Sequence, residues 1–188
     1  GVARADRPLA SPSPLAGRIF DALGERLTPS HTNKKGRRYR YYVSHGLLTG
    51  TAGSHAGGWR IPAPDLERAV AQAAAGVLGD RHAVSHALGE AGYGIADLPA
   101  ILARAAELGQ RLLGPVQNSF LLPEIVQRVE ICGDGLNLTI SLSAILPTDS
   151  SLDPPILQRH VPLRIRRRGV EMRLVLADAL SPRRVDPA

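Results

Sequence analysis

The period of the apolar residues changes between the middle and the last third of this 188-residue chain, and this change constrains the fold more than any other feature. From residue 125 to residue 142, apolar and polar residues alternate on both sides of "GDG" (133–135), a strong hairpin turn. Residues 161–176 repeat the alternation around a second turn at Arg168-Gly169. Four strands in two hairpins predict one antiparallel sheet with a buried face and a wet face. The predicted inward residues of the first strand are Ile125, Gln127, Val129 and Ile131.

The middle of the chain has helical periodicity instead. The stretch "PAPDLERAVAQAAAGVL" (62–78) predicts a helix with Pro64 and Asp65 near its beginning and Gly79 near its end, as helices commonly have. Further helices are predicted at 81–90 and 95–113. Ordinary core packing accounts for the apolar stripes of these helices, and a coiled-coil partner face is the alternative. The first stripe consists of Leu66, Ala69, Val70, Ala73, Val77 and Leu78.

Ahead of the helices, a small three-stranded β-ribbon is predicted. Its strands are residues 16–21, 26–31 and 37–44, joined by turns at 22–24 and at "NKKG" (33–36). The predicted class is therefore α+β, with this ribbon, a helical middle segment and a C-terminal antiparallel four-stranded sheet. The expected organisation is a flexible lead-in (1–14), the ribbon (15–45), a mobile loop (46–61), a helical segment (62–114), a sheet segment (115–180) and a tail (181–188).

The segment "NKKGRRYRYYVSH" (33–45) concentrates charge and aromatic surface. It holds five of the 23 Lys and Arg residues and three of the four tyrosines in a chain of net charge +6. Guanidinium groups bind phosphate through two parallel hydrogen bonds, and tyrosine adds a flat contact surface with a hydroxyl. The segment therefore suits a nucleic-acid backbone, while the alternative is a solvated basic strand whose tyrosines pack inward. A second cluster, "RIRRR" (164–168), has a similar alternative, in which Glu130, Asn137 and Thr139 on neighbouring strands are its partners.

Few residues suggest catalysis or metal binding. Cys132 is the only cysteine, so no cysteine-rich zinc site is expected. His82 and His86 share a helical face with Glu90, and this trio is a weak metal candidate beside the simpler interpretation of a helix surface. No Walker loop or nucleophile elbow is present. We therefore predict no catalytic residue, no metal and no cofactor.

The ends and the hydropathy of the chain suggest where it acts. The sequence has no run of eighteen apolar residues and no signal-peptide core, which predicts a cytoplasmic protein without a membrane partner. It begins at Gly1 without an initiator methionine, which suggests an excerpt of a longer protein, a gene remnant or a processed product.

The stretch "LAGRIFDALGERLTPSHTNKKGRRYRYYVSH" (15–45) resembles the recombinase zinc β-ribbon of large serine recombinases, the resolvase/invertase-type site-specific recombinases. "VPLRIRRRGVEMRLVL" (161–176) resembles a downstream segment of a proteobacterial branch, so the resemblance covers about residues 14–178. Metal-binding members carry paired cysteines in the ribbon, and this ribbon has none, so its tyrosines and aliphatic residues would have to form its core. The family's catalytic serine lies in a separate domain that this chain lacks.

The resemblance implies a non-catalytic, double-stranded DNA-binding module for DNA integration, excision or inversion, which would associate with other recombinase subunits and take no small-molecule substrate. Two alternatives remain: an RNA-binding or ribosome-associated protein, and a subunit-interaction module without DNA contact. The candidate DNA-binding residues are Lys34, Lys35, Arg37, Arg38, Tyr39, Arg40, Tyr41, Tyr42, Arg164, Arg166, Arg167 and Arg168.

Overall fold

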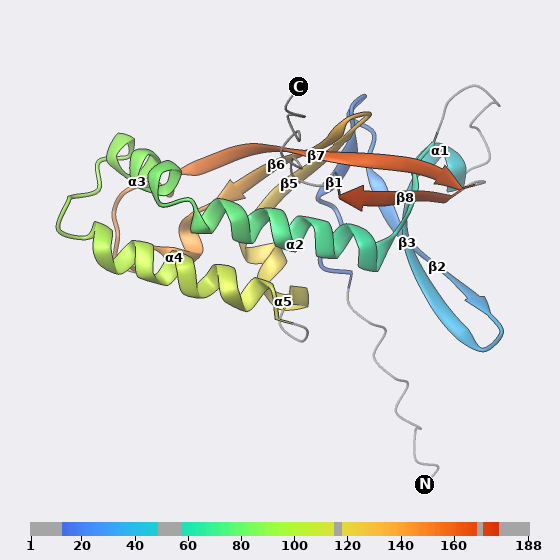
Figure 1. Cartoon of the computed structure of the whole chain (residues 1–188), viewed down its shortest axis with the longest axis horizontal. Coiled ribbons are helices and arrows are strands. Elements are labelled where there is room, and N and C mark those ends of the chain that lie inside the picture. The colour runs from blue at the N-terminus through green and yellow to red at the C-terminus, as the bar shows by residue number, and fades with distance from the viewer. Residues whose placement is uncertain (1–12, 49–57, 115–117, 169–170, 177–188) are drawn as a thin grey trace, which may run out of the picture.

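Two β-sheets and a layer of helices make up the α+β fold in a computed structural model, which describes residues 13–48, 58–114, 118–168 and 171–176 (Figure 1). The predicted fold class is confirmed. In chain order the elements are β1 (Ile19–Asp21), β2 (Leu27–Lys34), β3 (Arg37–Ser44), α1 (His45–Leu48), β4 (Arg60–Pro62), α2 (Ala63–Gly79), α3 (Arg81–Glu90), α4 (Leu98–Leu112), α5 (Asn118–Ile125), β5 (Val126–Cys132), β6 (Gly135–Ser141), the 3-10 helix η1 (Ser143–Ile145), β7 (Ile156–Arg168) and β8 (Glu171–Leu176).

The large sheet has the strand order β1-β5-β6-β7-β8, and its last four strands are antiparallel as predicted. The "GDG" turn joins β5 to β6, so that Ile131 lies opposite Leu136 and both are buried. One detail of the prediction was wrong, because Ile125 ends helix α5 and Gln127 is exposed. A register shift between Val126 and Arg128 lets Val126 point inward, and such a bulge breaks simple alternation.

Strand β1 belongs to the large sheet and not to the ribbon predicted for it. It pairs in parallel with β5, with Ile19 opposite Val129, and only an isolated bridge joins Phe20 to Arg26. Ile19 is fully buried there, so its side chain joins the larger core. The Asp21 carboxylate accepts hydrogen bonds from the backbone N–H groups of residues 23 and 25, which turns the chain away from the sheet.

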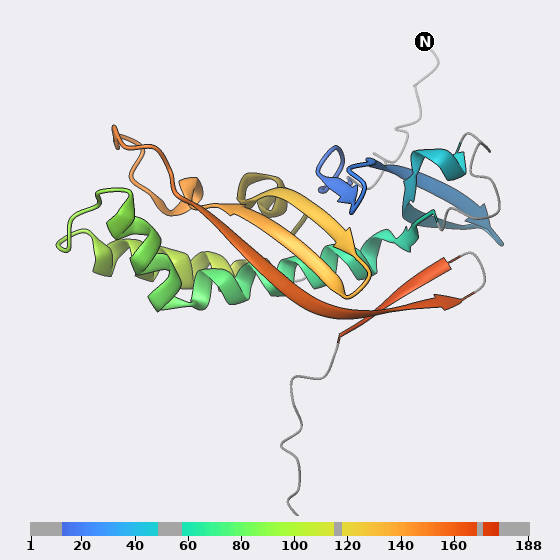
Figure 2. The ribbon, with the colours of Figure 1, turned by 90° about the horizontal axis from the view of Figure 1, so that it is seen from above.

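Helices α2, α4 and α5 cover one face of the large sheet, and α3 closes one end (Figures 1 and 2). The predicted stripe of α2 is buried with one exception: Ala73 is only partly buried at the edge of the core, and Ala74, which was not predicted, is fully buried in its place. Helices α2 and α4 run in opposite directions and pack closely, since a side chain at Gly109 would come within 3.3 Å of the Ala75 carbonyl oxygen. Among the helices that the structure describes, none is long and apolar enough to cross a membrane.

The small sheet is three-stranded and antiparallel, in the order β2-β3-β4. Its third strand is therefore β4, of which residues 60 and 61 belong to the segment expected to be a loop (46–61). Helix α1 occupies the start of that segment, and residues 49–57 lie outside the described residues. Leu27, Tyr42 and Ile61 are each fully buried and belong to the same core as α2. The small sheet is therefore supported by the same apolar core as the helices.

Candidate nucleic-acid interface

The hairpin of strands β2 and β3, here called the ribbon, extends from the body of the molecule at the end opposite α3 (Figure 1). Residues 31–39 are all exposed, so the tip of the ribbon presents both of its faces to solvent. Lys34 pairs with Arg37 across a two-residue turn, in which Lys35 and Gly36 have φ angles of 51° and 72°. Two positive φ angles are characteristic of the type I′ turn, which matches the twist of a two-stranded ribbon.

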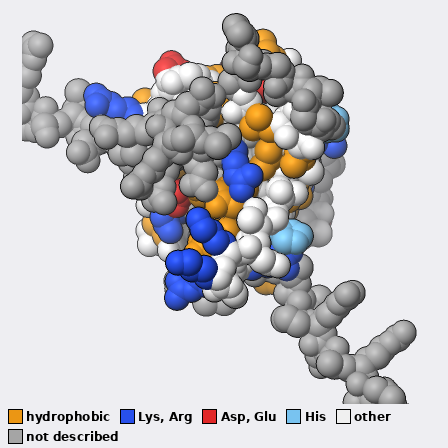
Figure 3. All heavy atoms as spheres, turned by 90° about the vertical axis from the view of Figure 1, so that its right-hand side faces the viewer, with side chains coloured by type: hydrophobic (Ala, Val, Ile, Leu, Met, Phe, Trp, Pro, Cys, Tyr) orange, Lys and Arg blue, Asp and Glu red, His pale blue; other side chains and the backbone are white. Residues whose placement is uncertain are grey.

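A groove of about 660 Å³ lies along the ribbon and the start of α2. Four of its cations, Lys34, Lys35, Arg37 and Arg38, form no ion pair with any residue that the structure describes. The single acidic residue of the groove, Asp65, lies 3.8 Å from Arg68. Lys and Arg side chains gather on this end of the molecule in Figure 3. The lining residues are Lys34, Lys35, Arg37, Arg38, Tyr39, Arg40, Tyr41, Pro62, Pro64 and Asp65.

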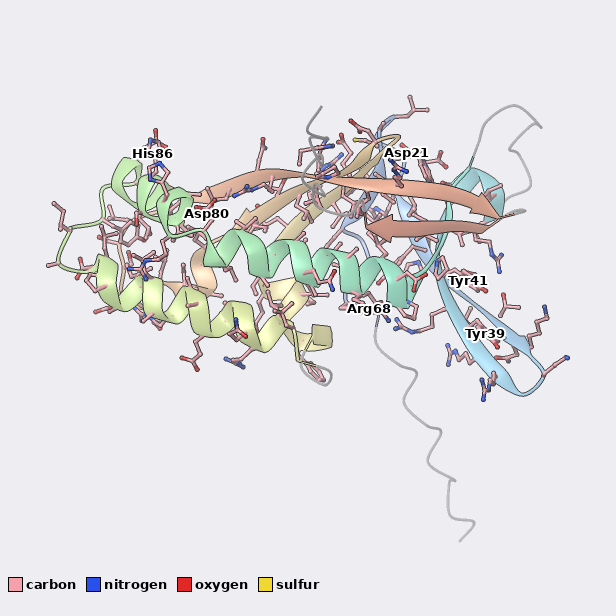
Figure 4. The ribbon with its side chains drawn as sticks, viewed as in Figure 1. Asp21, Tyr39, Tyr41, Arg68, Asp80 and His86 are labelled. Atoms are coloured by element: carbon pink, nitrogen blue, oxygen red, sulfur yellow. The ribbon has the colours of Figure 1, made fainter. Side chains whose placement is uncertain are left out.

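The three ribbon tyrosines have different environments. Tyr39 and Tyr41 lie along the same strand of the ribbon (Figure 4), and Tyr39 is 42% exposed. Tyr41 is half-buried, and the Arg60 guanidinium lies 4.2 Å from the centre of its ring in a cation–π contact. Tyr42, which the sequence placed among the candidate DNA-binding residues, is fully buried and belongs to the core.

Arg40, although basic and beside the groove, is held by a carboxylate. Its two terminal nitrogens donate to the two carboxylate oxygens of Glu67 on α2, both at 2.9 Å. The side chains are 19% and 13% exposed, and the bond to Glu67 raises the pKa of Arg40 although burial opposes this. A two-bonded pair of this kind is stronger and more directional than an ordinary surface pair.

The Tyr42 hydroxyl extends this network. It donates to Glu67 Oε1 at 2.9 Å and accepts the backbone N–H of Leu15 at 3.2 Å. Burial raises the pKa of Tyr42 well above its usual value, and the negative charge of Glu67 raises it further. Glu67 therefore receives three hydrogen bonds from β3 and fixes the ribbon on α2. No sequence pattern predicts this role, since Glu67 is one polar position of an amphipathic helix, 27 residues from Arg40.

The second basic cluster lies on β7, where it pairs with β8. Arg164 is exposed on β7, opposite Val175 of β8. Arg166, Arg167 and Arg168 continue β7 at backbone level, and their side chains lie outside the described residues. Strand β8 contacts β4 of the small sheet, so the end of the β7–β8 hairpin lies at the same end of the molecule as the ribbon (Figure 2).

The residues named as alternative partners for that cluster have other neighbours. Glu130 lies 3.7 Å from Arg128, and Asn137 Oδ1 lies 2.7 Å from His160 Nδ1. These residues, with Thr139, lie on the outer face of the large sheet, over a second groove of about 440 Å³. The two arginines of this groove each lie beside a carboxylate, Arg128 at 3.7 Å from Glu130 and Arg159 at 2.8 Å from Asp80, in contrast to the four tip cations of the ribbon.

The histidine candidates for metal binding lie on the surface of α3. His86 lies 3.4 Å from Glu90 on the exposed side of α3 (Figure 4), and His82 is also exposed. Within the described ranges, no three His, Cys, Asp or Glu side chains gather as a metal site requires. At the other end of α3, Asp80 accepts the backbone N–H of Ala83 at 3.1 Å, and this hydrogen bond, aided by Arg159, lowers the pKa of the Asp80 carboxyl.

Comparison of the chain with protein-family models, curated proteins and solved structures gives no match. The geometry of the ribbon and its groove therefore carries the functional argument.

Proposed function

We propose that this chain is a non-catalytic module that binds double-stranded DNA, as part of a serine site-specific recombinase that acts at the bacterial nucleoid. The observation that supports DNA binding is the group of four cations at the exposed ribbon tip, none of which has an ion pair among the described residues. Like charges held this close repel one another, and an anionic partner relieves that repulsion. The binding residues in this proposal are Lys34, Lys35, Arg37, Arg38 and Tyr39, with Arg164 as a second contact.

The recombinase part of the proposal depends on the resemblance of residues 15–45. That segment includes the whole ribbon together with the short strand β1. The buried Tyr42 and the Glu67 hydrogen bonds are consistent with a ribbon that keeps its position without cysteine ligands. The parent enzyme would supply the catalytic serine from a different domain.

Phosphate contacts can be counted by the salt dependence of binding. If the four tip cations each neutralise one phosphate, log K should fall with log salt with a slope of about −3.6. Fluorescence anisotropy with labelled duplex DNA at several salt concentrations measures this slope. The double substitution Arg37→Gln and Arg38→Gln should make the slope shallower by about 1.8, because two phosphate contacts are lost.

A matched control removes the same charge elsewhere. Arg81→Gln with Arg104→Gln takes two positive charges from exposed sites on α3 and α4, away from the ribbon. This control should leave the slope unchanged. Equal effects of the two double substitutions would show that net charge, and not the ribbon, determines binding.

A single-stranded RNA of equal length tests the main alternative. The exposed ring of Tyr39 is the observation that favours it, because bases of single strands stack on aromatic side chains. Tighter binding to RNA than to duplex DNA would replace the proposed ligand. Self-association by sedimentation without binding to either nucleic acid would support the subunit-interaction alternative.

A further inference from the structure

We propose that Arg60 is a further DNA-binding residue, which adds one phosphate contact on the face of the small sheet turned away from α2, here called its distal face. This inference rests on the proposed function and extends it beyond the two basic clusters. Arg60 lies on β4, in the segment that the sequence predicted as a loop, and the fold brings it next to the ribbon.

The two faces of the small sheet have different surroundings. Arg40 and Tyr42 on β3 donate hydrogen bonds to Glu67, so the side chains of these alternate residues point toward α2. Successive residues of a strand point to opposite faces, which places Tyr39 and Tyr41 on the distal face. The exposed ring of Tyr39 therefore belongs to the distal face.

The side chain of Arg60 crosses the distal face from β4 to β2. Arg60 lies opposite Val43 in the pairing of β4 with β3, and Val43 shares the face of Tyr41, two residues away. The Arg60 guanidinium lies 4.2 Å from the centre of the Tyr41 ring, and Arg60 Nη2 donates to Thr32 Oγ1 on β2 at 3.2 Å. Contacts with β3 and β2 thus hold the guanidinium in place on the ribbon.

These contacts leave Arg60 able to bind an anion. A guanidinium carries five N–H donors, and the hydrogen bond to Thr32, at the exposed surface, uses one of them. Among the residues that the structure describes, none forms an ion pair with Arg60. Tyr41 also lines the basic groove, so the charge of Arg60 lies beside that groove. A side chain that is already held in place loses less conformational freedom when it binds phosphate.

A second arginine over an aromatic ring provides the matched comparison. Arg128 on β5 lies 3.9 Å from the centre of the Phe20 ring, and its Nη2 lies 3.7 Å from a carboxylate oxygen of Glu130. Arg128 is on the large sheet beside an acidic partner, whereas Arg60 is held by a neutral hydroxyl against the ribbon. The two residues therefore share the ring contact and differ in the neighbouring carboxylate.

The expected effect can be stated as a salt slope, measured by fluorescence anisotropy on the full chain. Arg60→Gln should make the slope of log K against log salt shallower by about 0.9, because one phosphate contact is lost. Between 50 and 200 mM salt, this corresponds to about 3.5-fold less loss of affinity than in the unsubstituted chain. Arg60→Lys keeps the charge and should keep the slope, and Arg128→Gln should also leave it unchanged. Thermal melts establish that each variant is folded.

A second measurement needs no substitution and decides the matter if Arg60→Gln does not fold. In the unsubstituted chain with ¹⁵N-labelled arginine, the assigned Nε–Hε NMR signal of Arg60 should shift when duplex DNA is added. The signal of Arg128 should stay in place, because this arginine makes no phosphate contact.

The outcomes separate this inference from the proposed function. An unchanged slope in folded Arg60→Gln, or an equal change in Arg128→Gln, overturns this inference alone. A slope as shallow in Arg60→Lys as in Arg60→Gln overturns it too, as does an Arg60 NMR signal that stays in place while those of Arg37 and Arg38 shift. Absence of duplex binding by the unsubstituted chain at low salt overturns the proposed function and this inference with it.

Discussion

Removal of one oxygen atom tests how the ribbon is held. Tyr42→Phe keeps the buried ring and deletes the hydroxyl that donates to Glu67 at 2.9 Å and accepts the Leu15 N–H at 3.2 Å. A hydrogen bond to a charged group contributes about 1.5–3 kcal/mol, and a buried N–H without a partner costs about 1–3 kcal/mol. Because both bonds share one oxygen, the two figures overlap, and we expect a total loss of about 3 kcal/mol.

The assay is reversible unfolding by heat or urea, followed by circular dichroism. For a chain of this length, each kcal/mol lowers Tm by about 2–4 °C, so Tyr42→Phe should lower Tm by roughly 6–12 °C. Tyr39→Phe is the matched control, since its ring is 42% exposed and its change should remain within about 0.5 kcal/mol. Equal stability of the two variants would refute the claim that the Tyr42 hydroxyl supports the ribbon.

Other predictions concern pH, glycines and the cysteine. The pKa of the Tyr42 hydroxyl is raised in the folded chain, so the stability that the hydroxyl confers is complete below its unfolded pKa of about 10 and falls as pH rises above that value. Unfolding curves between neutral and alkaline pH measure this fall in stability, which should be smaller in Tyr42→Phe. Gly135→Ala should lower the free energy of unfolding, measured by urea titration, by about 1–3 kcal/mol, because the new methyl group would overlap the Val161 carbonyl oxygen. Gly76→Ala, on the open surface of α2, should raise it by about 0.5–1 kcal/mol. Burial, followed by neighbouring acidic groups, raises the pKa of the Cys132 thiol, so a thiol reagent at pH 8 should react more slowly with the native chain than with the chain in denaturant, and equal rates would contradict this.

Local patterns made the C-terminal sheet predictable. A hairpin depends on residues that are neighbours in sequence, so the "GDG" turn and the alternation of Leu136, Leu138 and Ile140 were sufficient to predict β5 and β6. The failure at Gln127 had a local cause too. Ile125 and Val126 are adjacent apolar residues, and a strand pattern can be started from either of them, while the helix end and the bulge select Val126.

Pairings between distant segments were beyond the reach of sequence patterns. Nothing in residues 19–21 indicates a parallel partner 110 residues later at Val129–Ile131. The ribbon presented the same difficulty, because both of its faces alternate guanidinium and phenol groups. Only the packing of α2 shows that Tyr42 is core, that Arg40 is paired and that Tyr39 is exposed. The sequence thus predicted the basic segment as a candidate site, but it did not predict which of its residues are exposed, paired or buried.

The parallel pairing of β1 with β5 has a consequence for how the molecule is made. During synthesis, β1 leaves the ribosome long before Val129–Ile131 exist, so Ile19 has no sheet to join until most of the helices are complete. The ribbon and the five α-helices that the structure describes lie in the loop that this late pairing closes, and contacts of such long sequence separation slow folding. A domain graft that moves residues 15–45 alone would carry Leu15, Ile19 and Tyr42 away from the core that buries them. The ribbon should therefore be transplantable only together with α2 and the large sheet, as one inseparable unit.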